Sequence, residues 1–251
     1  MKVFCLYYTD KYTPAYVSNL YRGLKRFSKV DFEFICYSDN LGVEADKVVA
    51  LPTDTKIKKH WHKIKFFDST FADQQPGEEI IVLDIDQIVV NSVDNMLSWP
   101  IKPGDLCSYD KWWGLDPNNP MKINGGWYKF ISGTMDYVYQ KYIADPEYWQ
   151  LYYFNQNIVT IPYFGEQNFV QDTVLEHGHN IITMPGRYVA KYHISDSIKN
   201  LSTNLTYIKK FNEPYMILDN VWNDAVKIVH FADLLNDIHH CTEPWINEFW
   251  Q

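Results

Sequence analysis

The sequence predicts one α/β domain built on a Rossmann-like, mostly parallel central sheet flanked by helices. Strand-like and helix-like segments alternate through the first 90 residues, which is the order expected for parallel strands joined by crossover helices. The strand-like segments are apolar throughout, as in strands that are buried on both faces. The chain has 251 residues and no internal repeat, low-complexity tract or linker, so we expect a single domain over 1–251 with a helical C-terminal tail.

The first half of the chain contains four strand-like and two helix-like segments. Thr13 is typical of a helix N-cap, and Pro14 suits the first helical position. The apolar residues Val17, Leu20 and Leu24 then fall on one face of a helix. The expected elements are a strand at 2–8, a helix at 14–27, strands at 31–40 and 46–52, a helix at about 61–71 and a strand at 79–84.

The second half is less regular, and a long polar loop at 110–122 interrupts it. That loop contains two adjacent tryptophans, Trp112 and Trp113. The expected elements are a short helix at 92–100, strands at 105–109, 123–130, 157–162 and 181–185, and helices at about 133–143 and 166–177.

Composition narrows the classes of function. The net charge is -8 and no long Lys/Arg block is present, so we expect no nucleic-acid partner. No apolar run reaches the roughly 20 residues of a membrane span, and the chain opens directly on a strand pattern, so we expect a cytoplasmic protein without a transmembrane segment. The four cysteines form no CxxC pair, and we expect them to be reduced core residues: Cys5, Cys36, Cys107 and Cys241.

Polar and acidic residues stand where three of the predicted strands end. They are Thr9 and Asp10, Ser38 and Asp39, and the pair Asp84 and Asp86. Because the carboxyl ends of parallel strands meet at one edge of a sheet, where α/β proteins bind ligands, we expect these residues to converge on one crevice. Aspartates are also common in loops, so an ordinary loop role for Asp10 and Asp39 is an equal alternative.

The stretch IIVLDIDQIVV, residues 80–90, places two carboxylates at the end of an apolar strand. If the chain turns there, Asp84 and Asp86 can reach one cation, and such oxygen ligands suit Mg²⁺ or Mn²⁺ bound with a substrate diphosphate. The residues that follow return to an apolar pattern, which indicates that the acids face a pocket rather than bulk water. His230, which follows an apolar run, is a candidate third ligand once such a site exists.

This stretch resembles the DxD motif of the GT-A nucleotide-sugar glycosyltransferases, and it is similar to that of glycosyltransferase family 8, the glycogenin and galactosyltransferase-like group. Further segments resemble the family in the same order, over residues 2 to about 233: FCLYYTDKYTPAYVSNLYRGLKRF, HWHKIKFF, INGGWYKFISGT, YFGEQNFVQD and VKIVHFAD. The family's His-Phe element continues with a glycine and a diphosphate-binding lysine, whereas this chain has Asp233 at the glycine position and Glu243 before Pro244 and Trp245.

The resemblance implies a role for each matching residue. The donor, a UDP-sugar, would be bound by Tyr8, Thr9, Asp10, Tyr12, Lys63, Asp84, Ile85, Asp86, Asn124, Gly125 and Gly126. A Mn²⁺ or Mg²⁺ ion would be held by Asp84, Asp86 and His230. The catalytic residues would be Glu166 and Gln167, which would lie under the donor sugar. Residues 1–100 would form a nucleotide-binding half, and residues 101–251 an acceptor-binding half with the C-terminal tail.

The implied activity is metal-dependent transfer of a hexose from UDP-hexose to a hydroxyl of a carbohydrate or glycoconjugate acceptor, as in glycan biosynthesis. The family implies retention, with Glu166 and Gln167 orienting the sugar while the leaving phosphate takes the proton. In an inverting enzyme, Glu166 would instead be the general base. Trp112, Trp113 and Trp127 could stack on acceptor sugars or pack on the core, and Asp110 and Asp116 could bond to acceptor hydroxyls or be solvated.

Two other functions fit parts of the sequence. A haloacid-dehalogenase-like phosphatase also has Asp-x-Asp after a strand, but near its N-terminus and with Thr or Val where this chain has Ile88. A catalytically inactive module that binds sugar nucleotides would keep the fold without the metal site. The combination of Asp84, Asp86, Glu166 and His230 favours an active transferase.

Overall fold

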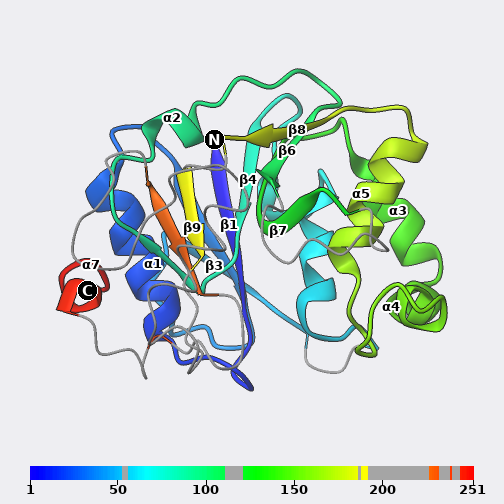
Figure 1. Ribbon diagram of the computed structural model, residues 1–251, viewed down its shortest axis with the longest axis horizontal. Coiled ribbons are helices and arrows are strands. Elements are labelled where there is room, and N and C mark those ends of the chain that lie inside the picture. Colours follow the sequence, from blue (N-terminus) through cyan, green and yellow to red (C-terminus); the bar gives the residue numbers. More distant parts are fainter. Residues whose placement is uncertain (53–55, 111–120, 186–187, 192–225, 232–237, 239–243) are drawn as a thin grey trace, which may run out of the picture.

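Two β-sheets organise the computed structural model (Figure 1), which describes residues 1–52, 56–110, 121–185, 188–191, 226–231, 238 and 244–251. The larger sheet has its strands in the spatial order β3 (Lys47–Ala50), β2 (Glu33–Ser38), β1 (Lys2–Tyr7), β4 (Glu79–Leu83), β7 (Ile123–Ile131), β6 (Leu106–Asp110) and β8 (Ile181–Met184). Only β7 runs against its neighbours β4 and β6, and the other pairs in this sheet are parallel. The predicted mostly parallel sheet is therefore confirmed.

Both faces of the larger sheet are buried, as the continuous apolar strands predict. On β1, Val3 and Cys5 face a core shared with helix α1 (Ala15–Phe27), whereas Phe4 and Leu6 face a second core. The helical elements packed around that second core are the 3₁₀ segment η1 (Lys59–Phe67) and helices α3 (Asp136–Ala144), α4 (Pro146–Asn155) and α5 (Glu166–Glu176). In Figure 1, α1 lies to one side of the sheet and α3, α4 and α5 lie to the other.

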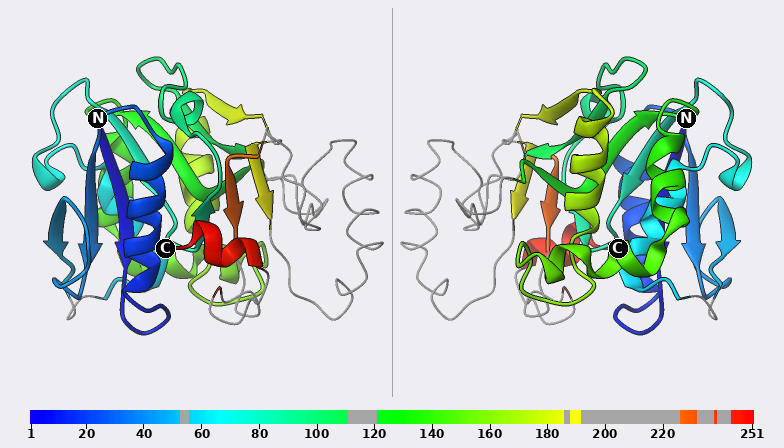
Figure 2. Two further views of the ribbon diagram at one scale, coloured as in Figure 1. Left: turned by 90° about the vertical axis from the view of Figure 1, so that its left-hand side faces the viewer. Right: turned by 90° about the vertical axis from the view of Figure 1, so that its right-hand side faces the viewer.

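Helix α7 (Pro244–Phe249) packs against α1, so that residues from the two ends of the chain meet. Arg26 Nη1 donates to Glu248 O over 3.0 Å, and the rings of Phe27 and Phe249 lie 5.8 Å apart. Figure 2 shows α1 and α7 along the same face of the molecule. Two short elements, η2 (Phe71–Asp73) and α2 (Asp94–Leu97), complete the helical parts that the structure describes.

The smaller sheet lies against α1 and contains strands β5 (Gln87–Val89), β10 (Ile228–His230) and β9 (Val189–Lys191). Strand β10 is antiparallel to β5, with His230 opposite Gln87, and parallel to β9. A Cβ on Gly23 of α1 would lie only 3.3 Å from Val89 Cβ, so this glycine lets the helix approach β5 closely. Residues 84–86 are the link from the large sheet to the small one.

Most of the predicted elements are present, and the structure adds four that we did not predict: β5, α4, β9 and β10. The expected strand at 157–162 is wrong, because the backbone there terminates α4. Ile158 and Val159 both donate to Tyr153 O, over 2.9 and 3.2 Å, and Asn157 has a left-handed φ of 58°. These backbone groups are engaged in closing the helix rather than in a strand ladder.

The expected helix at about 61–71 is replaced by two 3₁₀ segments, η1 and η2. Gln74 Nε2 donates to Phe66 O and Asp68 O, over 3.0 and 3.2 Å, so a side chain satisfies carbonyls that an α-helix would use. Asp68 Oδ1 in turn accepts from Thr70 N over 3.0 Å, which fixes the turn between the two segments.

Cys5, Cys36 and Cys107 are buried free thiols, as expected, whereas Cys241 is outside the described residues. Among the helices that the structure describes, none combines the length and the apolar character needed to cross a bilayer.

Candidate functional site

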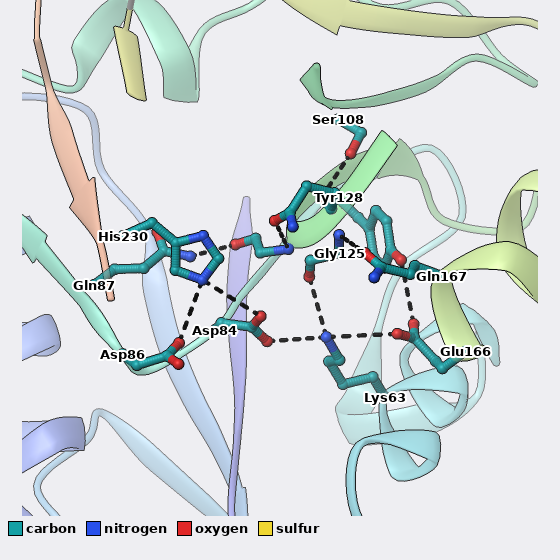
Figure 3. A network of polar contacts seen from close by, with 12 residues as sticks. Lys63, Asp84, Asp86, Gln87, Ser108, Gly125, Tyr128, Glu166, Gln167 and His230 are labelled. Carbon is teal, nitrogen blue, oxygen red and sulfur yellow. Dashed lines mark hydrogen bonds and ion pairs between the residues drawn. The ribbon is translucent and has the colours of Figure 1, made fainter. Parts of the chain in front are cut away.

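Asp84, Asp86 and His230 form a compact cluster at the carboxyl end of β4 (Figure 3). One ligand atom from each of the three residues lies within 4.8 Å of the others. His230 Nε2 is 3.5 Å from Asp86 Oδ1 and 4.0 Å from Asp84 Oδ2. The cluster forms because the chain turns after β4, so both carboxylates face the same side as the imidazole on β10.

Backbone hydrogen bonds fix this turn at both ends. Asp84 N donates to Gly126 O over 3.2 Å, and Phe231 N donates to Asp86 O over 2.8 Å. The side chain of Ile85, between the two acids, is buried in the core that contains α1. The turn therefore sends its two carboxylates toward the site and its apolar side chain into the core.

Asp86 is buried and is held in its ionised form. Tyr12 OH donates to Asp86 Oδ2 over 2.8 Å, and Lys11 Nζ donates to the same hydroxyl. Burial raises the pKa of Asp86, but hydrogen bonding and charge from His230 outweigh that effect. Lys11 and Tyr12 act in the same direction as His230, so the pKa of Asp86 lies well below its usual range.

Lys63, on η1, is buried between the carboxylates of Asp84 and Glu166. Its Nζ lies 2.9 Å from Asp84 Oδ1, 3.6 Å from Glu166 Oε2 and 3.1 Å from Gly125 O. Burial opposes the charge of Lys63, but the two carboxylates outweigh it and the pKa of Lys63 is raised. Lys63 is therefore a cation at neutral pH, and it connects the acidic turn to α5.

Glu166 and Gln167 open helix α5 and flank Gly125. Glu166 is only 3% exposed, and its Oε1 accepts from Tyr128 OH over 3.3 Å. Burial raises the pKa of Glu166 to about 7, with Lys63 acting against that rise and the Asp84 carboxylate adding to it. Gln167 Oε1 accepts from Gly125 N over 2.7 Å, which fixes the orientation of its amide group.

The glycine pair at 125 and 126 leaves space that side chains would fill. A Cβ on Gly125 would lie 2.9 Å from Tyr128 OH and 3.4 Å from Glu166 Oε2. A Cβ on Gly126 would lie 2.8 Å from Asn124 Oδ1 and 2.9 Å from His230 Cε1. Asn124 Oδ1 also accepts from Gly126 N over 2.9 Å, so the start of β7 is held closely against the site.

The predicted nucleotide-contacting residues lie at the same edge of the sheet. Thr9 N and Oγ1 both donate to Asp39 Oδ2, over 3.1 and 3.0 Å, which joins the ends of β1 and β2. Burial, followed by the charges of Asp10 and Asp84, raises the pKa of Tyr8. The three acidic strand ends therefore converge as expected, and the roles of these residues toward a nucleotide stay predictions.

Several other sequence-based candidates are settled or lie outside the described residues. Trp127 is fully buried and its ring lies 5.8 Å from that of Tyr109, so of its two predicted roles the packing role is the one observed. For the following candidates the structure describes neither the side chain nor, in most cases, the residue: Asp110, Trp112, Trp113, Asp116, Asp233, Glu243, Pro244 and Trp245.

Sequence reasoning missed three polar residues of the site: Lys11, Gln87 and Tyr128. Lys11 and Tyr128 lie within segments that resemble the family, but the resemblance assigns a role to neither of them. Gln87 was counted as the start of the apolar pattern after Asp86, yet it is a polar side chain with no exposed surface. A buried amide needs hydrogen-bond partners, and this requirement was the available signal.

The donor set fits a divalent cation. Two carboxylates and one imidazole that can reach a common point are ligands that such a cation accepts. Asp84 is partly exposed, with 30% of its side-chain surface accessible, so the cluster can be reached from solvent.

No model of a known protein family matches this sequence, and no curated protein is similar to it in sequence. Solved glycosyltransferases are nevertheless similar in structure. The galactosyltransferase LgtC, in complex with donor and acceptor sugar analogs, matches 99% of this chain and 94% of its own, with 11% sequence identity and a TM-score of 0.56. The glycosyltransferase GlyE of Streptococcus pneumoniae matches 92% of this chain, with 9% identity and a TM-score of 0.54.

This chain spans 54% of the length of GlyE. At such low sequence identity, the two similarities show the fold. The chain has the GT-A glycosyltransferase fold that the sequence predicts, and its Asp84, Asp86 and His230 cluster lies at the carboxyl edge of the sheet.

Proposed function

We propose that this protein is a metal-dependent glycosyltransferase that moves a hexose from a nucleoside diphosphate sugar, UDP-hexose in the first instance, to a hydroxyl of a carbohydrate or glycoconjugate. The observation that carries the proposal is the cluster of Asp84, Asp86 and His230 at the carboxyl edge of a GT-A sheet. In open α/β sheets, this edge is where ligands bind.

Asp84, Asp86 and His230 would hold the cation, Mn²⁺ by preference. A divalent cation at this place would neutralise charge that develops on a diphosphate leaving group. Asp86 suits this role because it is buried beside His230, and Tyr12 holds one of its oxygens over 2.8 Å. Lys63 balances the remaining charge of Asp84, since their atoms lie 2.9 Å apart.

Glu166 and Gln167 would bind and orient the donor sugar beside Gly125. Both side chains are held in place, Gln167 by Gly125 N and Glu166 by Tyr128 and Lys63. The burial of Glu166, which is only 3% exposed, supports an orienting role over that of a general base, because a base must reach the proton of the acceptor hydroxyl. We therefore propose retention, with the leaving phosphate accepting that proton.

The acceptor would approach over the loop that leads into α5. Ile161, Tyr163 and Phe164 of this loop are exposed, and they lie two to five residues before Glu166 along the chain. Exposed aromatic rings are suited to contact the apolar faces of sugars. This surface supports a carbohydrate acceptor.

The test is a screen of UDP-, GDP- and CMP-sugars with Mn²⁺ or Mg²⁺, read as thermal shift and as nucleotide release. We expect Mn²⁺ with a UDP-sugar to raise the melting temperature and to yield UDP. Release of phosphate from a phosphomonoester, without nucleotide release, would support the phosphatase alternative. Binding of a sugar nucleotide without turnover in the presence of varied sugar acceptors would support an inactive binding module.

A further inference from the structure

The candidate metal site is assembled from two different sheets, and Gln87 joins them. Asp84 follows β4 of the larger sheet, whereas His230 lies on β10 of the smaller sheet. The backbone of Gln87 belongs to β5 of the smaller sheet, where it pairs with His230. Its side chain has no exposed surface and extends to β7 of the larger sheet (Figure 3).

The side chain of Gln87 is hydrogen-bonded at both ends of its amide. Gln87 Nε2 donates to Gly126 O over 2.6 Å, and Gln87 Oε1 accepts from Tyr109 OH over 3.0 Å. Tyr109 is also buried, on β6 of the larger sheet, so both partners of the amide belong to that sheet. The smaller sheet is thus attached to the larger one by a polar link beside His230.

The carbonyl of Gly126 accepts a second hydrogen bond, from Asp84 N over 3.2 Å. One carbonyl therefore fixes both the first residue of the acidic turn and the residue that follows the turn. A Cβ on Gly126 would lie 2.9 Å from His230 Cε1 and 3.0 Å from Gln87 Nε2, which shows how closely these groups approach one another. A shift of Gln87 would change the position of His230 relative to Asp84.

We propose that Gln87 is a positioning residue that sets the separation of His230 from Asp84, and so the affinity of the site for a divalent cation. The proposal rests on the metal-binding role proposed above. A buried amide that only satisfied its own hydrogen bonds would affect folding alone. Because Gln87 shares the Gly126 carbonyl with Asp84 N and pairs with His230 in the smaller sheet, its loss also changes the metal site.

The test replaces Gln87 by methionine, which keeps the length of the side chain and removes both hydrogen bonds. The matched control is Gln74→Met, since Gln74 is also buried, donates to two backbone carbonyls and lies outside the site. Titration with Mn²⁺ alone, followed by calorimetry and by electron paramagnetic resonance, gives the affinity and the signature of the bound ion. Urea unfolding of each variant gives its stability.

We expect Gln87→Met to weaken Mn²⁺ binding by about 10-fold or more and to alter the resonance spectrum, as for other residues that hold metal ligands by hydrogen bonds. Gln74→Met should lose stability and keep wild-type affinity within about twofold. Tyr109→Phe removes only the bond to Gln87 Oε1, and we expect a smaller loss of affinity in the same direction, which tests the proposal even if Gln87→Met does not fold.

Wild-type affinity and an unchanged spectrum in a folded Gln87→Met variant would overturn the proposal and leave the transferase function standing. Unchanged affinity in Tyr109→Phe, when Gln87→Met does not fold, would overturn it as well. Absence of Mn²⁺ binding by the wild-type protein, alone and with each sugar nucleotide, would instead overturn the metal-dependent function on which the proposal rests.

Discussion

Lys63 Nζ lies 2.9 Å from Asp84 Oδ1, and through this contact a single buried cation connects the acidic turn after β4 with Glu166 at the start of α5. The two carboxylates therefore depend on the same charge. A divalent cation bound beside Asp84 would be a second positively charged group next to this carboxylate. The stability of the site would then depend on both Lys63 and the metal ion.

Replacement of Lys63 by methionine should leave Asp84 and Glu166 without their shared counter-charge. We expect a loss of about 3 kcal/mol in the free energy of unfolding, as for other broken buried ion pairs. Saturating Mn²⁺ should raise the free energy of unfolding of this variant by more than it raises that of the wild type, because the cation neutralises Asp84. Urea unfolding with and without Mn²⁺ measures both effects.

The matched control for this prediction is Lys129→Met. Lys129 is also fully buried, and it donates to Leu97 O and Trp99 O and pairs with Glu79 over 3.1 Å, away from the acidic turn. This variant should lose stability, and Mn²⁺ should raise its free energy of unfolding by no more than it raises that of the wild type. An equal gain from Mn²⁺ in Lys63→Met and Lys129→Met would show that the cation does not act at Asp84.

Glu166 should make the stability of the metal-free protein depend on pH. Burial raises the pKa of Glu166 to about 7 in the folded state, above its ordinary value of 4.5. Between these pH values the folded protein retains a proton that the unfolded chain releases, so this contribution is complete below pH 4.5 and is lost as the pH rises through 7. From pH 4.5 to 7.5, we expect the wild type to lose about 3 kcal/mol relative to Glu166→Gln.

Urea unfolding across this pH range gives the difference between the two proteins. Glu176→Gln is the control, since Glu176 lies at the exposed far end of the same helix and pairs with Lys141. Its pH profile should parallel that of the wild type. A Glu166→Gln profile that also parallels the wild type would contradict the raised pKa.

Gly126→Ala should disturb the metal cluster by crowding. The added methyl group would meet Asn124 Oδ1, His230 Cε1 and Gln87 Nε2 at 2.8, 2.9 and 3.0 Å, so the surrounding side chains must move. We expect a loss of about 2 kcal/mol in stability, as for other overpacked sites, together with weaker Mn²⁺ binding. Gly42→Ala is the control, because its Cβ would meet only Asn40 Oδ1, at 3.3 Å. If Gly126→Ala binds Mn²⁺ as tightly as the control, His230 is not held against Gly126 as described.

The sequence was sufficient to predict the sheet, because apolar strands and intervening helices leave a periodic pattern. It was also sufficient to single out Asp84 and Asp86, since two charges at the end of an apolar strand require a partner. The role of Lys63 as a bridge to Glu166 could not be predicted, because it depends on how η1 packs against β1 and α5. The failure at 157–162 has a similar origin, since Asn157 and Tyr153 end α4 through backbone bonds that no hydrophobic pattern reports.

Within the site, the role of Gln87 could not be predicted from the sequence for the same reason. Its position after Asp86 was visible, but its partners Gly126 and Tyr109 are distant in the sequence and meet it only when two sheets come together. Residues that act through tertiary contacts leave little trace in local composition. A fully buried amide in an apolar strand was the one indication that such contacts exist.

The most direct test of the account is Mn²⁺-dependent binding and turnover of a UDP-sugar by wild-type protein and by Asp86→Asn, which removes a metal ligand without changing its size. Asp105→Asn is the matched control, because Asp105 is a buried, hydrogen-bonded carboxylate that precedes β6 at the opposite edge of the sheet. We expect wild type and Asp105→Asn to show a thermal shift with Mn²⁺ and UDP-sugar and to release UDP, and Asp86→Asn to do neither. Equal Mn²⁺-dependent shift and turnover in Asp86→Asn would contradict the assignment of the metal site.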